Sequence, residues 1–186
     1  MLISNKERHF MTDKFTMACE ALYDDKKEHR FSWTRIWNKN KPTACVITIN
    51  PGSDSIYELD LTSMLIMNNV YRLGNFGGVC VVNLFSKISS RLKKDDFKDD
   101  ETMLKENITQ ILNSASKSNC IILAWGKSGE TNKYIAERER QVLSAIQPYI
   151  DKMFVISNEY GEHGLHPLSP SIRKEWKLIP YFNERQ

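Results

Sequence analysis

Four short apolar runs, rich in β-branched residues, recur along the chain and set its predicted architecture. Each run is almost continuously apolar and has a polar residue or glycine at or next to its end; the runs cover residues 43–50, 79–84, 120–126 and 153–158. Continuous rather than alternating apolar character is typical of strands that are covered on both faces, as in a parallel sheet. The pattern therefore predicts four buried strands.

Helical periodicity fills the three gaps between these runs. Apolar residues fall on one face of a helix over residues 61–70, 103–115 and 134–146, and either Asp60 or Thr62 is suited to cap the first helix. Strands that alternate with helices predict an α/β fold. We expect a three-layer α/β/α sandwich around a central, mainly parallel four-stranded sheet.

The N-terminal region follows a different pattern. Large aromatic residues recur at even spacing around Arg35, at Phe31, Trp33 and Trp37. This spacing favours a β-hairpin at the edge of the sheet, with a first helix as the alternative.

Length, charge and cysteine content narrow the class of protein. A chain of 186 residues suits a single domain over residues 1–186, with a hairpin or extension at 1–40 and an α/β core at 43–170. The 26 basic and 23 acidic residues give a formal net charge of +3, which excludes a dedicated electrostatic clamp for nucleic acid but permits local contacts. No run reaches the roughly 18–20 apolar residues of a membrane span, so we expect a cytoplasmic protein without a membrane partner. The four cysteines stand singly, and neither a disulfide framework nor a metal or cofactor site is predicted.

Polar residues and glycines follow each predicted strand. Ligands of open parallel sheets bind beyond the carboxyl ends of the strands. These segments therefore predict a polar site at one edge of the sheet; they are NPGSD at 50–54, NLFS at 83–86, WGKSG at 125–129 and the loop 161–170. The third segment lacks the spacing of a phosphate loop, which argues against a nucleoside triphosphatase.

Several of these residues belong to motifs that occur in a fixed order. The motifs are Arg30, Arg35 and Trp37; NPG at 50–52 followed by Asp60 and Thr62; VVNLF at 81–85; AWG at 124–126; and HPL at 166–168. The set resembles a bacterial and phage domain-of-unknown-function family, number 1643, over residues 30–168. That resemblance implies almost no biochemistry. Because residues five apart on a regular strand point to opposite faces, we expect Arg35 to reach the site while Arg30 packs over a tryptophan.

A more distant resemblance implies a mechanism. INPG at 49–52, GVCVVN at 78–83, WG at 125–126 and HPLSPS at 166–171 are similar, in order and position, to motifs of the uracil-DNA glycosylase superfamily. In that superfamily the first motif carries an acidic or amide residue before a proline, and an asparagine at the end of the second strand reads the base. The resemblance implies a uracil-DNA glycosylase-like fold with a pocket for a nucleobase, a nucleotide or DNA.

Carried to this chain, the resemblance also implies roles for single residues. Asn50 would orient a water at the anomeric carbon, Asn83 would bind the base edge, and His166 would donate to a base carbonyl where negative charge develops. Leu168 would fill the gap left by a flipped base. The other expected substrate contacts are Pro51, Gly52, Asp54, Phe85, Trp125, Gly126 and Arg35. The expected phosphate contacts are Lys127, Ser169, Ser171 and Arg173.

The sequence allows more than one role for two carboxylates and more than one function for the protein. Asp54 and Asp60 either activate water better than a neutral amide or cap the following helix. One hypothesis is an enzyme that hydrolyses an N-glycosidic bond in DNA or in a nucleotide with a uracil-like or modified base. The alternative is a protein that binds a nucleobase, nucleotide or modified DNA without chemistry, favoured by Asn50 in place of a carboxylate. A third is a structural or interaction domain. The oligomeric state is not predicted.

Overall fold

A seven-stranded sheet forms the centre of the computed structural model, which describes residues 11–53, 55–97 and 100–181. The strand order is β1-β2-β4-β3-β5-β6-β7. The strands are β1 (Ala18–Tyr23), β2 (Arg30–Ile36), β3 (Thr43–Thr48), β4 (Gly78–Asn83), β5 (Cys120–Leu123), β6 (Met153–Ser157) and β7 (Lys177–Pro180). The four central strands β4, β3, β5 and β6 are parallel, whereas β1, β2 and β7 add to the sheet in antiparallel pairing.

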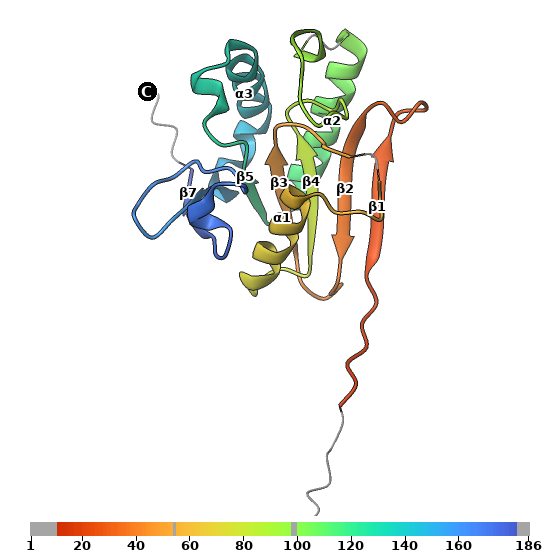
Figure 1. Ribbon diagram of the computed structural model, residues 1–186, viewed down its shortest axis with the longest axis vertical. Helices are drawn as coiled ribbons and strands as arrows, with labels where there is room; N and C mark the ends of the chain where they lie inside the picture. Colours follow the sequence, from red (N-terminus) through yellow and green to blue (C-terminus); the bar gives the residue numbers. More distant parts are fainter. Residues whose placement is uncertain (1–10, 54, 98–99, 182–186) are drawn as a thin grey trace, which may run out of the picture.

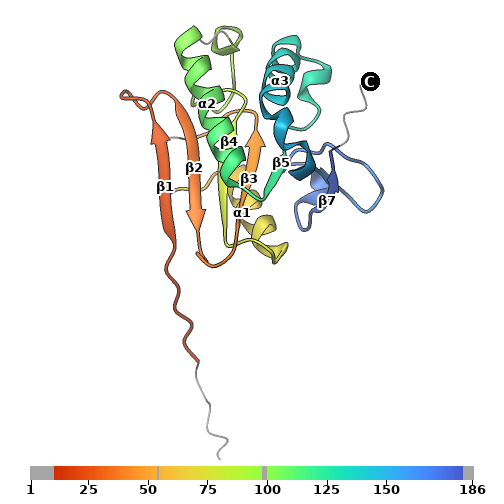
Figure 2. The same cartoon turned by 180° about the vertical axis from the view of Figure 1, so that it is seen from behind.

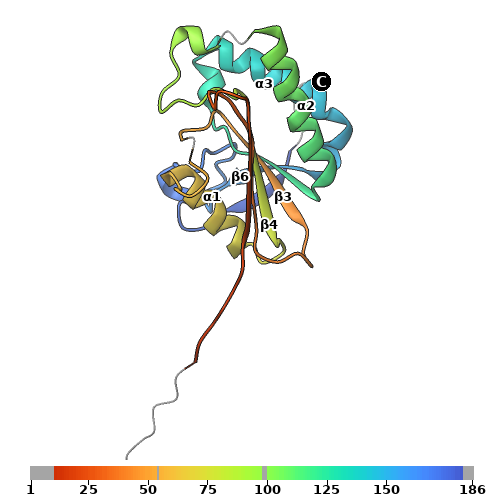
Figure 3. The same ribbon diagram turned by 90° about the vertical axis from the view of Figure 1, so that its right-hand side faces the viewer.

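Helices cover both faces of this sheet. They are α1 (Leu61–Arg72), α2 (Glu101–Lys117) and α3 (Lys133–Ile146). Helix α1 lies on one face and α2 and α3 lie on the other, as opposite views show (Figures 1 and 2). A view turned by a quarter shows the three layers from the side (Figure 3).

The order of the crossovers creates an opening at the carboxyl ends of the central strands. The chain passes from β3 through α1 to β4, and then through α2 back past β3 to β5. Helix α1, which follows β3, and helix α3, which follows the neighbouring strand β5, therefore lie on opposite faces of the sheet (Figures 1 and 2). In open α/β sheets, such a reversal leaves a crevice outside the strand ends, where ligands bind.

The predicted α/β class, the four central strands and the N-terminal hairpin are confirmed, but the predicted four-stranded sheet is too small. The hairpin of β1 and β2 joins the same sheet because β2 pairs with β4. Strand β7 was not predicted at all. It has only four residues, with two apolar residues between a lysine and a proline, which is too short for an alternating or continuous apolar signal.

Alternate residues of the central strands fill two apolar cores. Cys45 and Ile47 of β3 pack in the core under α2 and α3, whereas Ala44 and Val46 pack in the core under α1. Two of the four cysteines, Cys45 and Cys120, are buried, and Cys19 is exposed. Within the described part of the chain, no helix is both long enough and apolar enough to cross a membrane.

Candidate functional site

A cavity of about 190 Å³ lies at the carboxyl ends of β3 and β4, on the face of the sheet that α1 covers. Its polar lining comes from six separate segments, and includes Arg30, Thr48, Asn50, Asp60, Thr62, Ser63, Asn83, Ser89, Ser90 and His166. Gly52 and the apolar residues Ile49, Ile66, Val81 and Leu168 complete the wall. Pockets for drug-sized ligands have volumes of about 300–1,000 Å³, so this cavity has room for one small group such as a single ring.

Asn83, the last residue of β4, is the most buried polar residue of the cavity. Its side chain is 1% exposed, and its Oδ1 accepts a hydrogen bond of 2.6 Å from the Thr48 hydroxyl on the neighbouring strand. Among the described residues, its Nδ2 has no hydrogen-bond partner. A buried amide without a partner costs about 1–3 kcal/mol, which a ligand that accepts a hydrogen bond would offset.

His166 is held in one orientation by its own loop. The Leu168 backbone N–H donates to Nδ1 over 3.2 Å, and the Ser169 backbone N–H donates to the His166 carbonyl over 2.8 Å. Burial lowers the pKa of His166, which favours the neutral ring. Because Nδ1 accepts, the single ring proton of the neutral form is assigned to Nε2, which leaves Nε2 as a donor.

Gly126 supports the same ring from behind. It has a φ of +75°, and a Cβ at this position would lie 2.8 Å from the His166 Cβ. Any larger residue would therefore displace His166 as well as strain the backbone. Gly126 does not line the cavity itself, so its contribution to the site is the position of the histidine.

Asn50 follows β3 and lines the cavity with its amide nitrogen already engaged. Nδ2 donates to the Ser89 carbonyl over 2.6 Å and to the Pro51 carbonyl over 3.1 Å. The Ser89 N–H in turn donates to the Pro51 carbonyl over 2.9 Å. These bonds fix the side chain and leave Oδ1 as its acceptor toward a ligand or water.

The structure corrects the expectation for the two arginines, because it is Arg30 and not Arg35 that lines the cavity. The pairing of β1 with β2 shifts register between Leu22 and Tyr23, which marks a bulge in β2 next to Arg30. The extra residue changes the alternation, so the expectation of opposite faces is wrong. Both arginines are buried and reach the segment 53–57. Arg30 donates to the Ser53 carbonyl and Arg35 to the Ile56 carbonyl.

Both guanidinium groups keep an Nε without a hydrogen-bond partner among the described residues, but their surroundings differ. Arg35 stacks over the Trp33 ring at 5.1 Å, as a cation-π pair that the sequence suggested for the other arginine. Arg30 is 4% exposed; burial lowers its pKa, and the negative charge of Asp60 opposes this shift. Arginine nevertheless stays protonated in proteins. The cavity therefore contains a buried cation.

Asp60 rather than Thr62 caps α1. Its Oδ1 accepts a hydrogen bond of 2.7 Å from the Ser63 backbone N–H. A Cβ on Gly52 would lie 2.8 Å from the other carboxylate oxygen, Oδ2. The sequence allowed two roles for Asp60, a helix cap or an activator of water. In the structure Asp60 lies both at the N-terminus of α1 and in the cavity wall.

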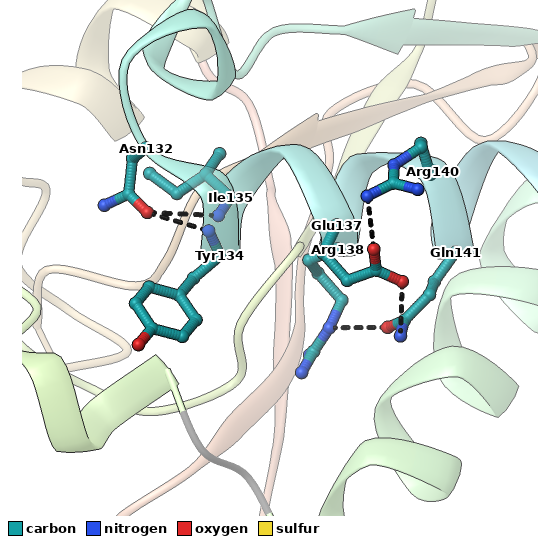
Figure 4. Close-up of polar contacts among 7 residues, drawn as sticks. All are labelled: Asn132, Tyr134, Ile135, Glu137, Arg138, Arg140 and Gln141. Atoms are coloured by element: carbon teal, nitrogen blue, oxygen red, sulfur yellow. Dashed lines mark hydrogen bonds and ion pairs between the residues drawn. The ribbon is translucent and has the colours of Figure 1, made fainter.

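A second polar cluster supports the end of β4 from the opposite face. Asn107 of α2 donates from Nδ2 to the carbonyls of Asn83 and Leu84, over 3.0 and 3.1 Å. Arg138 of α3 donates to the same Leu84 carbonyl over 3.0 Å and lies 4.6 Å over the Phe85 ring. Figure 4 shows Arg138 also bonded to Gln141 along the helix. Residues 83–85 are thereby fixed on the side away from the cavity.

The other predicted site residues lie outside the wall of this cavity. Phe85 and Trp125 pack in the core under α2 and α3, and Pro51 is buried beside Asn50. Among the expected phosphate contacts, Lys127, Ser171 and Arg173 are exposed and Ser169 is half-buried; Arg173 donates to the Leu168 carbonyl and Ser171 accepts from Asn158. Asp54 lies outside the described residues. The sequence reasoning did not single out Thr48, Ser89 and Ser90. Thr48 ends β3 and the two serines lie in the segment after β4, and no motif distinguishes these hydroxyls from others in the chain.

Comparison with known proteins places the chain in a family without assigning its chemistry. Residues 30–168 match the family model described as "Protein of unknown function (DUF1643)". No curated protein and no solved structure gives a significant match. The family match covers more than half of the chain, so the chain belongs to the DUF1643 family.

Proposed function

We propose that this member of the DUF1643 family binds a uracil-like base in the cavity and hydrolyses the N-glycosidic bond that joins the base to a sugar. The observation that carries the proposal is the free Nδ2 of buried Asn83 in a cavity of single-ring size. A buried donor without a partner, next to a fixed histidine, suits a ligand with carbonyl oxygens. The motif resemblance to the uracil-DNA glycosylase superfamily supports the same assignment.

The polar groups around the cavity match the edge of a pyrimidine. Asn83 offers Nδ2 as a donor, and its Oδ1 keeps a second lone pair beside the Thr48 hydroxyl for a ring N–H. His166 offers Nε2–H to a second carbonyl. A base that presents a donor in place of a carbonyl would face these donors directly and would be rejected, because buried polar groups would be left unpaired.

Bond cleavage then requires charge stabilisation and a positioned water. As the glycosidic bond breaks, negative charge moves to the base, and the His166 donor stabilises it with a rate contribution of about 10²–10³. Arg30 adds a fixed positive charge in the same cavity. Asn50, held through Nδ2, orients the attacking water with Oδ1.

Contacts with a nucleic acid backbone would be local. The loop after β6 carries Ser169, Ser171 and Arg173, and Lys127 follows β5. Leu168 lines the cavity and would fill the space of a base drawn out of a stack. The modest net charge of +3 supports a substrate with few phosphate contacts, such as a single strand, a mismatched site or a mononucleotide. In these substrates, removing the base from a pair also costs least.

A second candidate function is binding of the same base without hydrolysis. The amide of Asn50 favours it, because a neutral amide cannot accept the proton of an attacking water. Base recognition by Asn83 and His166 is common to both functions.

Purified protein incubated with oligonucleotides that each carry one uracil or one modified pyrimidine tests the proposal. The set includes single strands, duplexes, mismatched duplexes and the free nucleotides, and the readouts are abasic sites and released base. We expect base release from at least one probe, reduced by 10² or more in Asn83→Ala and His166→Ala. His163→Ala is the matched control, since His163 lies in the same loop but is exposed.

The outcomes separate the two candidate functions. Base release that depends on Asn83 and His166 supports the hydrolase. Retention of a probe that depends on Asn83, without release, supports the binding protein. Neither release nor retention of any probe rejects both.

A further inference from the structure

One step of the proposed reaction has no residue assigned to it. An attacking water must lose a proton, and the amide of Asn50 cannot take it. Of the described residues that line the cavity, Asp60 alone carries a carboxylate. It lies in the same wall as Gly52 of the turn that follows Asn50.

The two oxygens of Asp60 have separate surroundings. Oδ1 is fixed by the Ser63 backbone N–H at the start of α1. The hydrogen bonds within the described part of the chain do not engage Oδ2, which faces Gly52 so closely that a Cβ there would lie 2.8 Å from it. The cap therefore orients the carboxylate, and glycine at position 52 leaves space in front of its free oxygen.

Two further observations show that this oxygen shares its cavity with polar groups that lack a partner among the described residues. Arg30, buried in the same cavity, has a free Nε among the described residues and interacts with the charge of Asp60. The free Nδ2 of buried Asn83 lies in the same wall. The N-terminus of α1 also interacts favourably with a negative charge at the capping position.

We infer that Asp60 is the general base of the reaction and that Asn50 orients the water for it. This inference rests on the proposed function. A lone pair of the water oxygen forms the bond to the anomeric carbon, and the bond from that carbon to the ring nitrogen breaks with its electron pair leaving on the base. One water proton passes to Oδ2 of Asp60 and then to the departing base. The products are the free base and a sugar with a hydroxyl on the anomeric carbon.

The variant Asp60→Asn distinguishes the role of Asp60 as a general base from its role as the cap of α1. Asparagine caps helices as well as aspartate does, so the variant keeps the hydrogen bond from Ser63 and loses only the proton acceptor. The probe is the single-stranded oligonucleotide with one deoxyuridine, or the modified pyrimidine that the wild type cleaves fastest. We expect kcat to fall by roughly 10²–10⁴ in Asp60→Asn, with KM within a factor of about three.

Chemical rescue tests whether the carboxylate of Asp60 acts in the reaction, because formate would not restore activity if Asp60 were only a helix cap. Asp60→Ala removes the carboxylate and opens space beside Gly52, so added formate should restore part of its rate. Formate should not restore Asn50→Ala, whose defect is the orientation of water. Asp60→Ser, which keeps a capping side chain without a carboxylate, should match Asp60→Asn in rate and in Tm.

The possible results distinguish this inference from the proposed function. Full base release by Asp60→Asn, still dependent on Asn83, overturns the role of Asp60 and leaves the proposed function standing. A loss in Asp60→Ala alone, without formate rescue and with a lowered Tm, reduces Asp60 to a cap. If the wild type releases base from none of the probes, the proposed hydrolase fails and the general base fails with it.

Discussion

Each face of the sheet has a buried asparagine and a buried arginine near the end of β4, and the two pairs make different contacts. Under α2 and α3, Asn107 and Arg138 donate to the carbonyls of residues 83 and 84. Under α1, Asn83 and Arg30 line a cavity, and each keeps a nitrogen without a partner among the described residues. The Oδ1 of Asn107 is also unpartnered, but Asn107 does not line the cavity.

This difference shows how burial alone fails to identify a functional residue. All four side chains are less than 7% exposed. The donors under α2 and α3 satisfy backbone carbonyls and hold the strand end in place, which contributes to stability. The free donors under α1 lower stability and face a cavity, a combination that natural proteins keep where a ligand supplies the missing partner.

The largest expected effect is on the cavity side, in the double variant Thr48→Val/Asn83→Leu. It removes both partners of the buried hydrogen bond together with the free donor, so the free energy of unfolding should change by less than about 1 kcal/mol. Base release or retention should fall by 10² or more. Urea unfolding and the oligonucleotide assay measure the two quantities. A loss of several kcal/mol with base binding intact would make Asn83 a structural residue like Asn107.

The opposite behaviour is expected of Asn107→Leu. This change leaves the Asn83 carbonyl without the donor from α2, which should cost about 1–3 kcal/mol of unfolding free energy. In a chain of this size each kcal/mol lowers Tm by about 2–4 °C. Base binding per folded molecule should change far less than in the double variant. If thermal unfolding is unchanged while base binding is lost, the contrast between the two faces is incorrect.

On the cavity side, the sequence predicted the position of a residue only where that position follows from the order of the parallel strands. Asn50, Asn83 and His166 follow strands that the apolar pattern locates, so the rule for parallel strand ends places them at one edge. Their roles stay predictions. Arg30 was missed because a β-bulge changes the alternation of β2, and no residue in β2 signals that bulge. The pair under α2 and α3 was also missed, because Asn107 and Arg138 occupy positions that a helical pattern marks only as polar.

A smaller effect is expected from the glycine behind His166. Gly126→Ala places a Cβ 2.8 Å from the His166 Cβ and forces alanine into a left-handed conformation, which costs roughly 1–2 kcal/mol. Gly161→Ala is the matched control, because its φ is +84° but no atom lies within 4 Å of the added Cβ. Both variants should lose the stability that the left-handed conformation costs, and Gly126→Ala should lose more because its Cβ also clashes with His166. Gly126→Ala alone should weaken base binding. Equal binding by the two variants would show that the position of His166 is unimportant.

The smallest expected effect is a pH dependence of stability that arises on the cavity face of the sheet and not on the face under α2 and α3. Burial lowers the pKa of His166 below 6.5, so between the lowered value and 6.5 the unfolded chain binds more protons than the folded chain. Stability therefore rises with pH across this window and is lost as the solution becomes more acidic. The contacts of Asn107 and Arg138 under α2 and α3 involve no histidine, so they should not respond in this window.

Unfolding of the wild type and of His166→Gln at pH 7 and pH 5 measures this contribution, with His163→Gln as the control in the same loop. His166→Gln should lose less stability on acidification than the other two proteins, because it has no partly buried imidazole to protonate. Base binding by the wild type should also weaken at pH 5, since a protonated Nδ1 can no longer accept from the Leu168 N–H and the loop loses the bond that orients the ring. An identical pH response of all three proteins would mean that His166 titrates as an exposed histidine does, and would remove the argument that the ring is a neutral donor.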